Sequence, residues 1–183
     1  NMLAPGKTDV YNIAWTYGGN GSVSNWLNTS YCPWTTKPTS FKSVNEKTDK
    51  MQGYANTIAL QEYNKAEGEN SIQRAKPIVA LVAFESNHPA PTKSSGWYWP
   101  SVKELEYVCW GQEATEGIGG RNRLNEQFRK VNGAMEFGVS FYWSSAEYSR
   151  DNGAWSVDFE DGYVYGGGSK SGNAYCVRPL LAF

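Results

Sequence analysis

Residues 154–162 read Ala-Trp-Ser-Val-Asp-Phe-Glu-Asp-Gly, and this stretch decides the fold class of the C-terminal part of the chain. Trp155, Val157 and Phe159 alternate with polar residues, which is the period of a half-buried β-strand. The Asp-Gly pair that ends the stretch is a hairpin turn signal. We therefore expect a β-hairpin whose return strand covers residues 163–165.

Further strand patterns lie on both sides of this hairpin. Residues 141–144 are strand-like, and residues 175–180 predict a final strand. Pro179 implies that this last strand is an edge strand or ends there, because proline cannot donate a hydrogen bond to a neighbouring strand. The glycines and serines of residues 166–172 predict a flexible display loop between the return strand and the final strand.

Helical signals occupy the middle of the chain. Ser101 and Glu104 form a capping-box pattern, in which each side chain accepts a backbone N–H at the start of a helix. A helix is therefore expected from Val102 to about Gln112. Residues 75–84 fit a helix or a buried strand, and Pro77 favours the helix because proline is suited to a first helical turn.

Two more helices follow from the spacing of apolar residues. Met51, Tyr54 and Ile58, with Tyr63 as a further candidate, recur at near-helical spacing, which predicts a helix over about 50–66 with Asp49 as its N-cap. After a glycine-rich loop at residues 117–120, we expect a short helix that carries Leu124, Phe128 and Val131. Gly133 is suited to end it.

The length of 183 residues fits one domain. Residues 1–48 are rich in Gly, Asn, Ser, Thr and Trp, and predict short strands and long loops that belong to the same domain or form a short appendage. Residues 49–183 are expected to form the main domain. With helices in the middle and an antiparallel sheet at the end, the predicted class is α+β.

The charge balance argues against some classes of partner. The 17 basic and 18 acidic residues give a net charge of −1, which offers no electrostatic footprint for nucleic acid or an anionic membrane. The mean hydropathy is −0.58. Since no apolar run reaches the length of about 18 residues that a bilayer needs, we expect no membrane insertion by this chain.

Catalytic and metal-binding patterns are weak. His88 is the single histidine, and Cys32, Cys109 and Cys176 lie far apart without metal-ligand spacing, so we expect no enzyme, no cofactor and no metal site. Asp158, Glu160 and Asp161 are a conceivable calcium group, but the first two are expected to point into solvent from an alternating strand.

Composition favours binding. Ser, Gly and Tyr make up 16 of the 33 residues from Ser144 to Cys176. Antibody-like surfaces use this mixture, because tyrosine offers a large amphipathic face while serine and glycine adapt to a ligand. A glycine-rich hairpin whose tyrosines pack across strands is the other interpretation.

Four blocks of sequence carry a resemblance to a known family. They are Gly96-Trp-Tyr-Trp-Pro-Ser-Val-Lys-Glu-Leu105, Tyr142-Trp-Ser-Ser-Ala-Glu147, Ala154 to Gly162, and Val177-Arg-Pro-Leu-Leu-Ala-Phe183. In order and spacing they resemble a C-type-lectin-fold family of bacterial and phage surface proteins. Many members, in gut Bacteroidales such as Bacteroides and in their bacteriophages, are variable proteins of diversity-generating retroelements, which rewrite the end of the gene at template adenines.

The resemblance implies a C-type-lectin-like fold with residues 144–176 as the variable region of a ligand-binding face. Its implied partner is a protein or glycan on another cell or surface, and its implied place is the bacterial cell surface, a pilus or a phage fibre, outside the cell. The implied ligand-binding residues are Ala146, Tyr148, Ser149, Arg150, Asp151, Asn152, Gly153, Ser156, Asp158, Asp161, Tyr163, Tyr165, Gly166, Gly167, Gly168, Ser169, Ser171, Gly172, Asn173, Ala174, Tyr175 and Cys176.

The genetic code offers an internal check. Replacing adenines in AAC or AAT codons cannot produce Lys, Glu, Gln, Met or Trp. In the 144–176 window these types occur only at Glu147, Trp155, Glu160 and Lys170. Three of them, Glu147, Trp155 and Lys170, fall on positions that the family pattern treats as framework.

Strand alternation divides the expected roles. The side chains expected in the core are Trp143, Trp155, Val157, Phe159, Val164, Val177 and Leu180. Ser156, Asp158, Tyr163 and Tyr165 are expected to face outward, where they can change without disturbing the packing. The tripeptides that C-type lectins use to bind sugar through calcium are missing, which leaves aromatic stacking on sugar open. A static pilus or fibre domain of the same fold is the alternative function.

Overall fold

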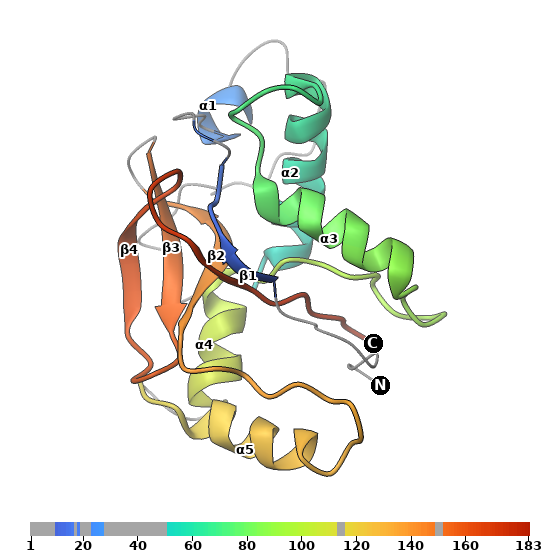
Figure 1. Ribbon diagram of the computed structural model, residues 1–183, viewed down its shortest axis with the longest axis vertical. Helices are drawn as coiled ribbons and strands as arrows, with labels where there is room; N and C mark the ends of the chain where they lie inside the picture. Colours follow the sequence, from blue (N-terminus) through green and yellow to red (C-terminus); the bar gives the residue numbers. More distant parts are fainter. Residues whose placement is uncertain (1–9, 17, 19–22, 28–50, 113–115, 149–151) are drawn as a thin grey trace.

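The computed structural model describes residues 10–16, 18, 23–27, 51–112, 116–148 and 152–183, and it has the predicted α+β class (Figure 1). The elements run in the order β1(Val10–Ile13), α1(Val23–Leu27), α2(Gly53–Glu67), α3(Lys76–Asn87), α4(Val102–Trp110), α5(Gly119–Phe128), β2(Phe141–Glu147), β3(Gly153–Asp158), β4(Val164–Ser169) and β5(Tyr175–Val177). Within these described ranges, no helix is long and apolar enough to cross a membrane.

The five strands form one mixed sheet in the order β1-β5-β2-β3-β4. The predicted hairpin is the antiparallel pair β3–β4, and its turn contains Gly162 at a φ of 93°, a conformation that glycine adopts without strain. β5 runs parallel to β2, with Tyr142 opposite Cys176, and β1 pairs antiparallel with β5. The strand near the N-terminus therefore lies in the same sheet as the C-terminal hairpin.

The capping box at Ser101 is confirmed and does more than start α4. The Glu104 carboxylate accepts the Ser101 backbone N–H at 2.7 Å, as the capping box requires. It also accepts the backbone N–H of Gly53 at 3.0 Å, at the start of α2. One carboxylate thus joins the first turns of two helices, and Gly53 fits because an added Cβ would lie 2.2 Å from it.

Two other predicted helices are confirmed in place but differ in detail. Residues 76–87 form a helix with Pro77 in its first turn, and residues 53–67 form the helix expected over 50–66. Of the residues whose spacing predicts this helix, Tyr63 is buried, whereas Met51 and Tyr54 are 62% and 50% exposed. The buried side carries Ala59 and Leu60 together with Tyr63, because these positions face the core built by the N-terminal segment and α3. The predicted cap Asp49 lies outside the described residues.

The helix expected around Leu124 begins earlier and ends earlier. α5 includes Gly119 and Gly120, which the sequence assigned to a loop, and it stops at Phe128 rather than near Gly133. Gly120 packs so closely on α4 that an added Cβ would lie 2.6 Å from the carbonyl oxygen of Val108. Glycine therefore occurs inside this helix because α4 and α5 approach each other so closely that a side chain would not fit between them.

The sheet buries side chains on both faces. One cluster contains Trp143 and Val177 with residues of α2 and α3, and the other contains Tyr142, Trp155, Val157 and Phe159 with residues of α4 and α5. The predicted core residues are thus buried, except that Val164 and Leu180 are only half-buried. Ser156 was expected to face solvent and is fully buried, because it lies opposite the buried Trp143.

Residues 166–172 are predicted to form a flexible loop, but the first half of this segment belongs to a strand. Gly166, Gly167, Gly168 and Ser169 belong to β4. An added Cβ at Gly168 would lie 2.6 Å from the Trp143 ring, and one at Gly166 would lie 2.6 Å from the Tyr148 ring. These glycines are present because aromatic rings pack directly on the strand backbone.

A buried ion pair joins distant parts of the chain. Glu147 ends β2 and Lys170 follows β4, and their side chains are each 1% exposed with Nζ 2.5 Å from Oε1. The same oxygen accepts the backbone N–H of Val23 at 2.9 Å, at the start of α1. Lys170 Nζ also lies 4.6 Å from the centroid of the Trp15 ring, a cation–π contact.

We predict that breaking this pair destabilises the fold strongly. Glu147→Gln or Lys170→Met leaves one buried charge without its partner, which should lower the free energy of unfolding by about 3–5 kcal/mol. The double variant Glu147→Met/Lys170→Met should lose less than the sum of the two single losses. Urea unfolding measures the free energy of unfolding of all three variants. Arg129→Gln, which breaks the exposed Arg129–Glu136 pair, is the control and should change stability least. Single losses as small as the control would contradict the assigned role.

A second prediction concerns the glycines of β4. Gly168→Ala places its methyl group against the Trp143 ring and should destabilise the protein by about 1–3 kcal/mol through overpacking. Gly167→Ala meets the hydroxyl end of the Tyr165 ring, and this partly exposed side chain can shift more easily than the buried Trp143, so its cost should be smaller. Thermal unfolding of the two variants compares them directly. Equal melting temperatures would contradict the close packing of Gly168 against the Trp143 ring.

Candidate functional site

Four aromatic side chains form a continuous row on the surface of the sheet, which we call the aromatic face: Phe141, Tyr163, Tyr165 and Tyr175. Ring centroids are 6.5 Å apart between Tyr163 and Tyr165, 6.3 Å between Tyr165 and Phe141, and 4.9 Å between Phe141 and Tyr175. Tyr163 is 53% exposed and Tyr165 37% exposed, while the other two are half-buried. The row therefore presents ring surface to solvent.

Strand register places these residues on one side of the sheet. Phe141 lies opposite Asp158, and Ser156 lies opposite both Trp143 and Tyr165. Because side chains at paired positions share a face, Phe141, Asp158 and Tyr165 are on the same face as Trp143. Their neighbours Tyr142, Val157 and Val164 point to the α4 side.

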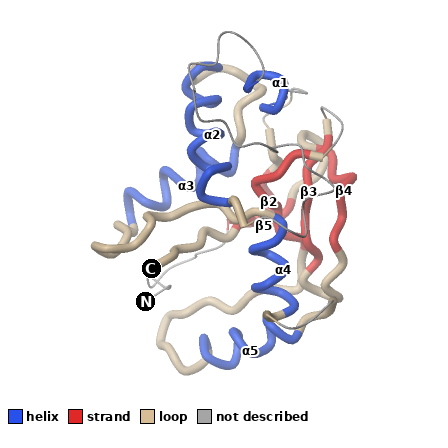
Figure 2. Tube along the Cα trace, turned by 180° about the vertical axis from the view of Figure 1, so that it is seen from behind, coloured by secondary structure: helices blue, strands red, loops and turns tan. Residues whose placement is uncertain are grey.

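Only part of this sheet face is covered by helices. α2 and α3 pack near β1 and the Trp143 end of β2, whereas β3 and β4 stand clear of them in both views (Figures 1 and 2). Tyr175 marks the boundary, since its ring lies 4.4 Å from the buried Trp143 ring on one side and stacks on Phe141 on the other. The aromatic face is thus anchored to the core at one end.

A carboxylate lies beside the aromatic rings. Asp158 is half-buried, and its Oδ1 accepts the backbone N–H of Glu160 at 2.9 Å. The pKa of Tyr175 is raised above its ordinary value, mainly by partial burial and further by the nearby Tyr165 and Asp158. Its phenol is therefore neutral and a hydrogen-bond donor at physiological pH. The face can therefore stack on a flat apolar group and exchange hydrogen bonds with hydroxyl or amide groups.

The other exposed residues of the expected binding set lie in two places. Asp161 belongs to the closed turn of the β3–β4 hairpin, next to Tyr163. Asn152 and the turn after Lys170 lie at the opposite, open end of the hairpin, where Gly153 pairs with Ser169. The exposed residues of the expected set thus occur at both ends of the hairpin, with Tyr165 and Gly167 between them on β4.

The expected ligand-binding residues differ in exposure. Exposed are Asn152, Asp161, Tyr163, Tyr165, Gly167, Ser171, Gly172 and Ala174. Half-buried are Tyr148, Asp158, Gly166, Ser169, Asn173 and Tyr175. Buried are Ala146, Gly153, Ser156, Gly168 and Cys176. Ser149, Arg150 and Asp151 lie outside the described residues.

Burial of five of these residues corrects the expectation that they line an exposed face. Cys176 lies opposite Tyr142 on the α4 side, and Ala146 belongs to the same buried cluster. Gly153 is covered by the Tyr148 side chain, with 3.2 Å between that side chain and an added Cβ. Ala146, Gly153 and Ser156 lie on β2 and β3, which have neighbouring strands on both sides, and Gly168 on the edge strand β4 is covered by the Trp143 ring.

Phe141 belongs to the aromatic face although the sequence indicated only a strand there. It stacks on Tyr175 at an interplanar angle of 22° and contacts Tyr165 across the sheet. The signal that could have found it is register: pairing residue 141 with residue 158 puts it beside the outward Asp158. Sequence alternation alone does not specify that register.

No group of three or more metal-ligating side chains gathers within the described ranges. Burial raises the pKa of the Cys109 thiol to about 12, although the nearby Arg121 opposes that rise. Cys109 and Cys176 are both free thiols. The groups on the aromatic face are suited to contact with a ligand, through ring surface, phenol hydroxyls and one carboxylate.

The fold is similar to that of a fimbrial protein from Bacteroides ovatus, known from a crystal structure. The TM-score is 0.74 at 22% sequence identity, and the match covers 96% of this chain and 34% of the fimbrial protein. The chain thus spans about a third of the length of that protein and shares the fold of the matched part. No protein-family profile matches the chain, and neither does any curated protein.

Proposed function

We propose that this chain is a ligand-binding domain of a surface-displayed, fimbria-like protein, and that the aromatic face makes the contact. The observation that carries this proposal is the row of rings that ends in the exposed Tyr163 and Tyr165. Tyr165 meets Phe141 edge-on, and Phe141 stacks on the half-buried Tyr175, which packs on the buried Trp143. The shared fold with a fimbrial protein supports display outside the cell as part of a pilus. A phage fibre is the other setting that the proposal includes. The proposal also includes a C-type-lectin-like fold for this domain.

Tyrosines on a rigid strand suit binding for a physical reason. A tyrosine has few rotatable bonds, so little side-chain entropy is lost when a ligand covers it, and it offers both ring surface and a hydroxyl. Tyr163 and Tyr165 touch each other and lie on or next to β4, which limits their freedom before any ligand arrives. Pre-ordering of this kind lowers the entropic cost of association.

Binding fits the described chemistry better than catalysis. Cys109 has a raised pKa, which keeps its thiol protonated and weakly nucleophilic at neutral pH. The His88 ring stacks on Phe84 at 4.5 Å, and its Nδ1 lies 3.2 Å from the carbonyl oxygen of Phe84 at the end of α3. Both groups take part in packing, and neither lies on the aromatic face.

Retroelement diversification of the C-terminal face is part of the proposal. Three of the four residues in the 144–176 window that adenine mutagenesis cannot produce, Glu147, Trp155 and Lys170, are buried. This supports a division between a constant core and a changeable face. The buried Ser156 and Gly168 instead favour the second candidate, a static fimbrial domain in which the hairpin is purely structural.

An adhesion assay tests the contact surface. Fluorescent beads coated with the chain should adhere to at least one member of a panel of bacterial and epithelial cells. Tyr163→Ser/Tyr165→Ser should reduce the bead count tenfold or more, since aromatic anchors dominate binding energy. The melting temperature should stay nearly unchanged, because both side chains are exposed.

Tyr54→Ser on α2 is the matched control, because Tyr54 is similarly exposed but lies on another element. Beads carrying that variant should adhere like the unaltered chain. Adhesion that survives loss of both face tyrosines, or is absent from every cell type, would favour the static structural domain.

Sequencing of the gene's 3′ end and flanks in many sibling isolates tests diversification. We expect variation confined to adenine-derived codons and concentrated at exposed positions such as Tyr163, Tyr165 and Ser171. A near-copy of the segment and a reverse-transcriptase gene should lie nearby. A uniform sequence without a template copy would contradict diversification. It would not bear on ligand binding, which the adhesion assay tests separately.

A further inference from the structure

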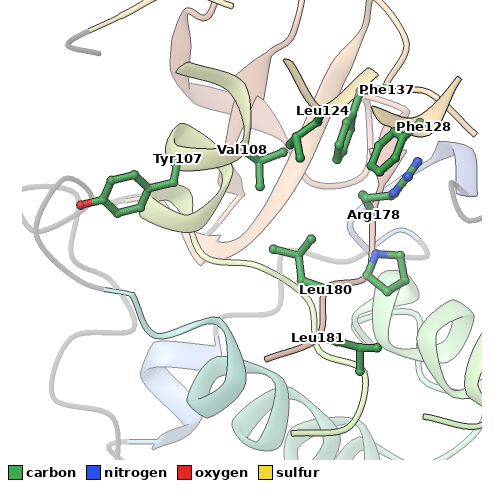
Figure 3. Close-up of a pocket in the computed structure, with 9 residues that line it drawn as sticks. Tyr107, Val108, Leu124, Phe128, Phe137, Arg178, Leu180 and Leu181 are labelled. Carbon is green, nitrogen blue, oxygen red and sulfur yellow. The ribbon is translucent and has the colours of Figure 1, made fainter. Parts of the chain in front are cut away.

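A cavity of about 220 Å³ lies on the far side of the sheet from the aromatic face, between α4, α5 and the C-terminal segment (Figure 3). Val108 and Leu124 line it on one side, and Leu180 and Leu181 line it on the other. Val108, Leu124 and Leu180 are only half-buried, so the cavity reaches the surface. A group that enters it would remove their remaining apolar surface from water.

The cavity lies where the two hydrophobic clusters of the protein meet. Leu181 belongs to the cluster of α2 and α3, whereas Phe128 and Phe137 belong to the cluster of α4 and α5. Side chains from both clusters reach the cavity without filling it. A volume of this size exceeds the roughly 150 Å³ of an apolar cavity that holds a benzene ring.

One charged residue is among the nine that line this cavity, and it is a cation. The Arg178 side chain is 4% exposed, and its guanidinium carbon lies 4.4 Å from the Phe137 ring centroid and 5.5 Å from that of Phe128. Its Nη2 donates to the backbone oxygen of Met135 at 3.0 Å. Stacking and this bond hold the guanidinium in a fixed place.

Arg178 places its guanidinium among the apolar side chains that line the cavity. Because the surroundings are apolar, its field is screened less than it would be in water, and an anion entering the cavity gains more from it. The cavity therefore combines apolar walls with a fixed positive charge.

We propose that this cavity is a second binding site, which takes a small apolar monocarboxylate such as an arylalkanoate or a short fatty acid. The apolar part of the ligand lies between α4, α5 and the C-terminal segment, and its carboxylate lies toward Arg178. This site is separate from the aromatic face and does not depend on the function proposed above.

The test uses the unaltered chain with two probes of nearly equal size. 3-Phenylpropanoate carries the carboxylate, and 3-phenylpropanamide replaces it with a neutral amide. Methyl NMR titration at neutral pH should show the acid shifting the Leu124 and Leu180 signals, with an affinity about tenfold or more above that of the amide, as expected for an interaction with a charged group.

Variants then assign the two parts of the site. Arg178→Gln should abolish the preference for the acid, and Leu124→Trp should fill the cavity and weaken both probes. Arg129→Gln is the matched control, because it removes an arginine that follows the last residue of α5 and pairs with Glu136 without lining the cavity. That variant should bind the acid like the unaltered chain.

Three outcomes would overturn the proposal. They are equal affinity for the acid and the amide, shifts confined to other parts of the protein, and no shift at the solubility limit of the acid. The comparison of acid and amide needs no variant, so it decides the matter even if Arg178→Gln fails to fold. Near-ultraviolet circular dichroism of each variant identifies such a failure.

Discussion

The buried ion pair between Glu147 and Lys170 is the constraint on which the rest of the sheet depends. Removing two charges from water is costly, and only their mutual contact, together with further hydrogen bonds, offsets that cost. Here the offset includes the backbone N–H of Val23 and the ring of Trp15, and the backbone N–H of Thr16 donates to the carbonyl oxygen of Lys170 at 2.9 Å. The end of β2, the turn after β4 and the N-terminal segment therefore all meet at this ion pair.

Three tryptophans extend this arrangement through the core. The indole N–H of Trp15 donates to the carbonyl oxygen of Ser144, that of Trp99 to Trp143, and that of Trp143 to Ile13. Each ring thus fills volume and also satisfies a backbone oxygen from another segment. Because Trp143 lies on β2, the same contacts orient the strand from which Phe141 emerges.

The aromatic face follows from this core. Tyr175 packs on Trp143 and then on Phe141, and Phe141 reaches Tyr165, so the row of rings begins in the buried cluster and ends in solvent. The inner rings of this row support the outer ones, and the outer tyrosines Tyr163 and Tyr165 are exposed to solvent.

The two proposed sites use opposite faces of one sheet. On the aromatic face, the strands are left uncovered and present tyrosines. On the other face, α4 and α5 cover the sheet, and the cavity beside Arg178 remains where the helices and the C-terminal segment do not meet. Substitutions in one site should therefore leave the other unchanged, which makes the two proposals separable.

Local signals in the sequence predicted several features correctly, because their causes lie within a few residues. The capping box of Ser101 and Glu104, the alternation around Val157 and the turn at Gly162 all depend on neighbouring backbone groups. Tertiary structure alone decided the burial of Ser156, the strand at Gly168 and the place of Phe141 in the aromatic face. Each depends on which strand pairs with which and on the Trp143 ring, and such contacts between residues distant in the chain are not encoded in local periodicity.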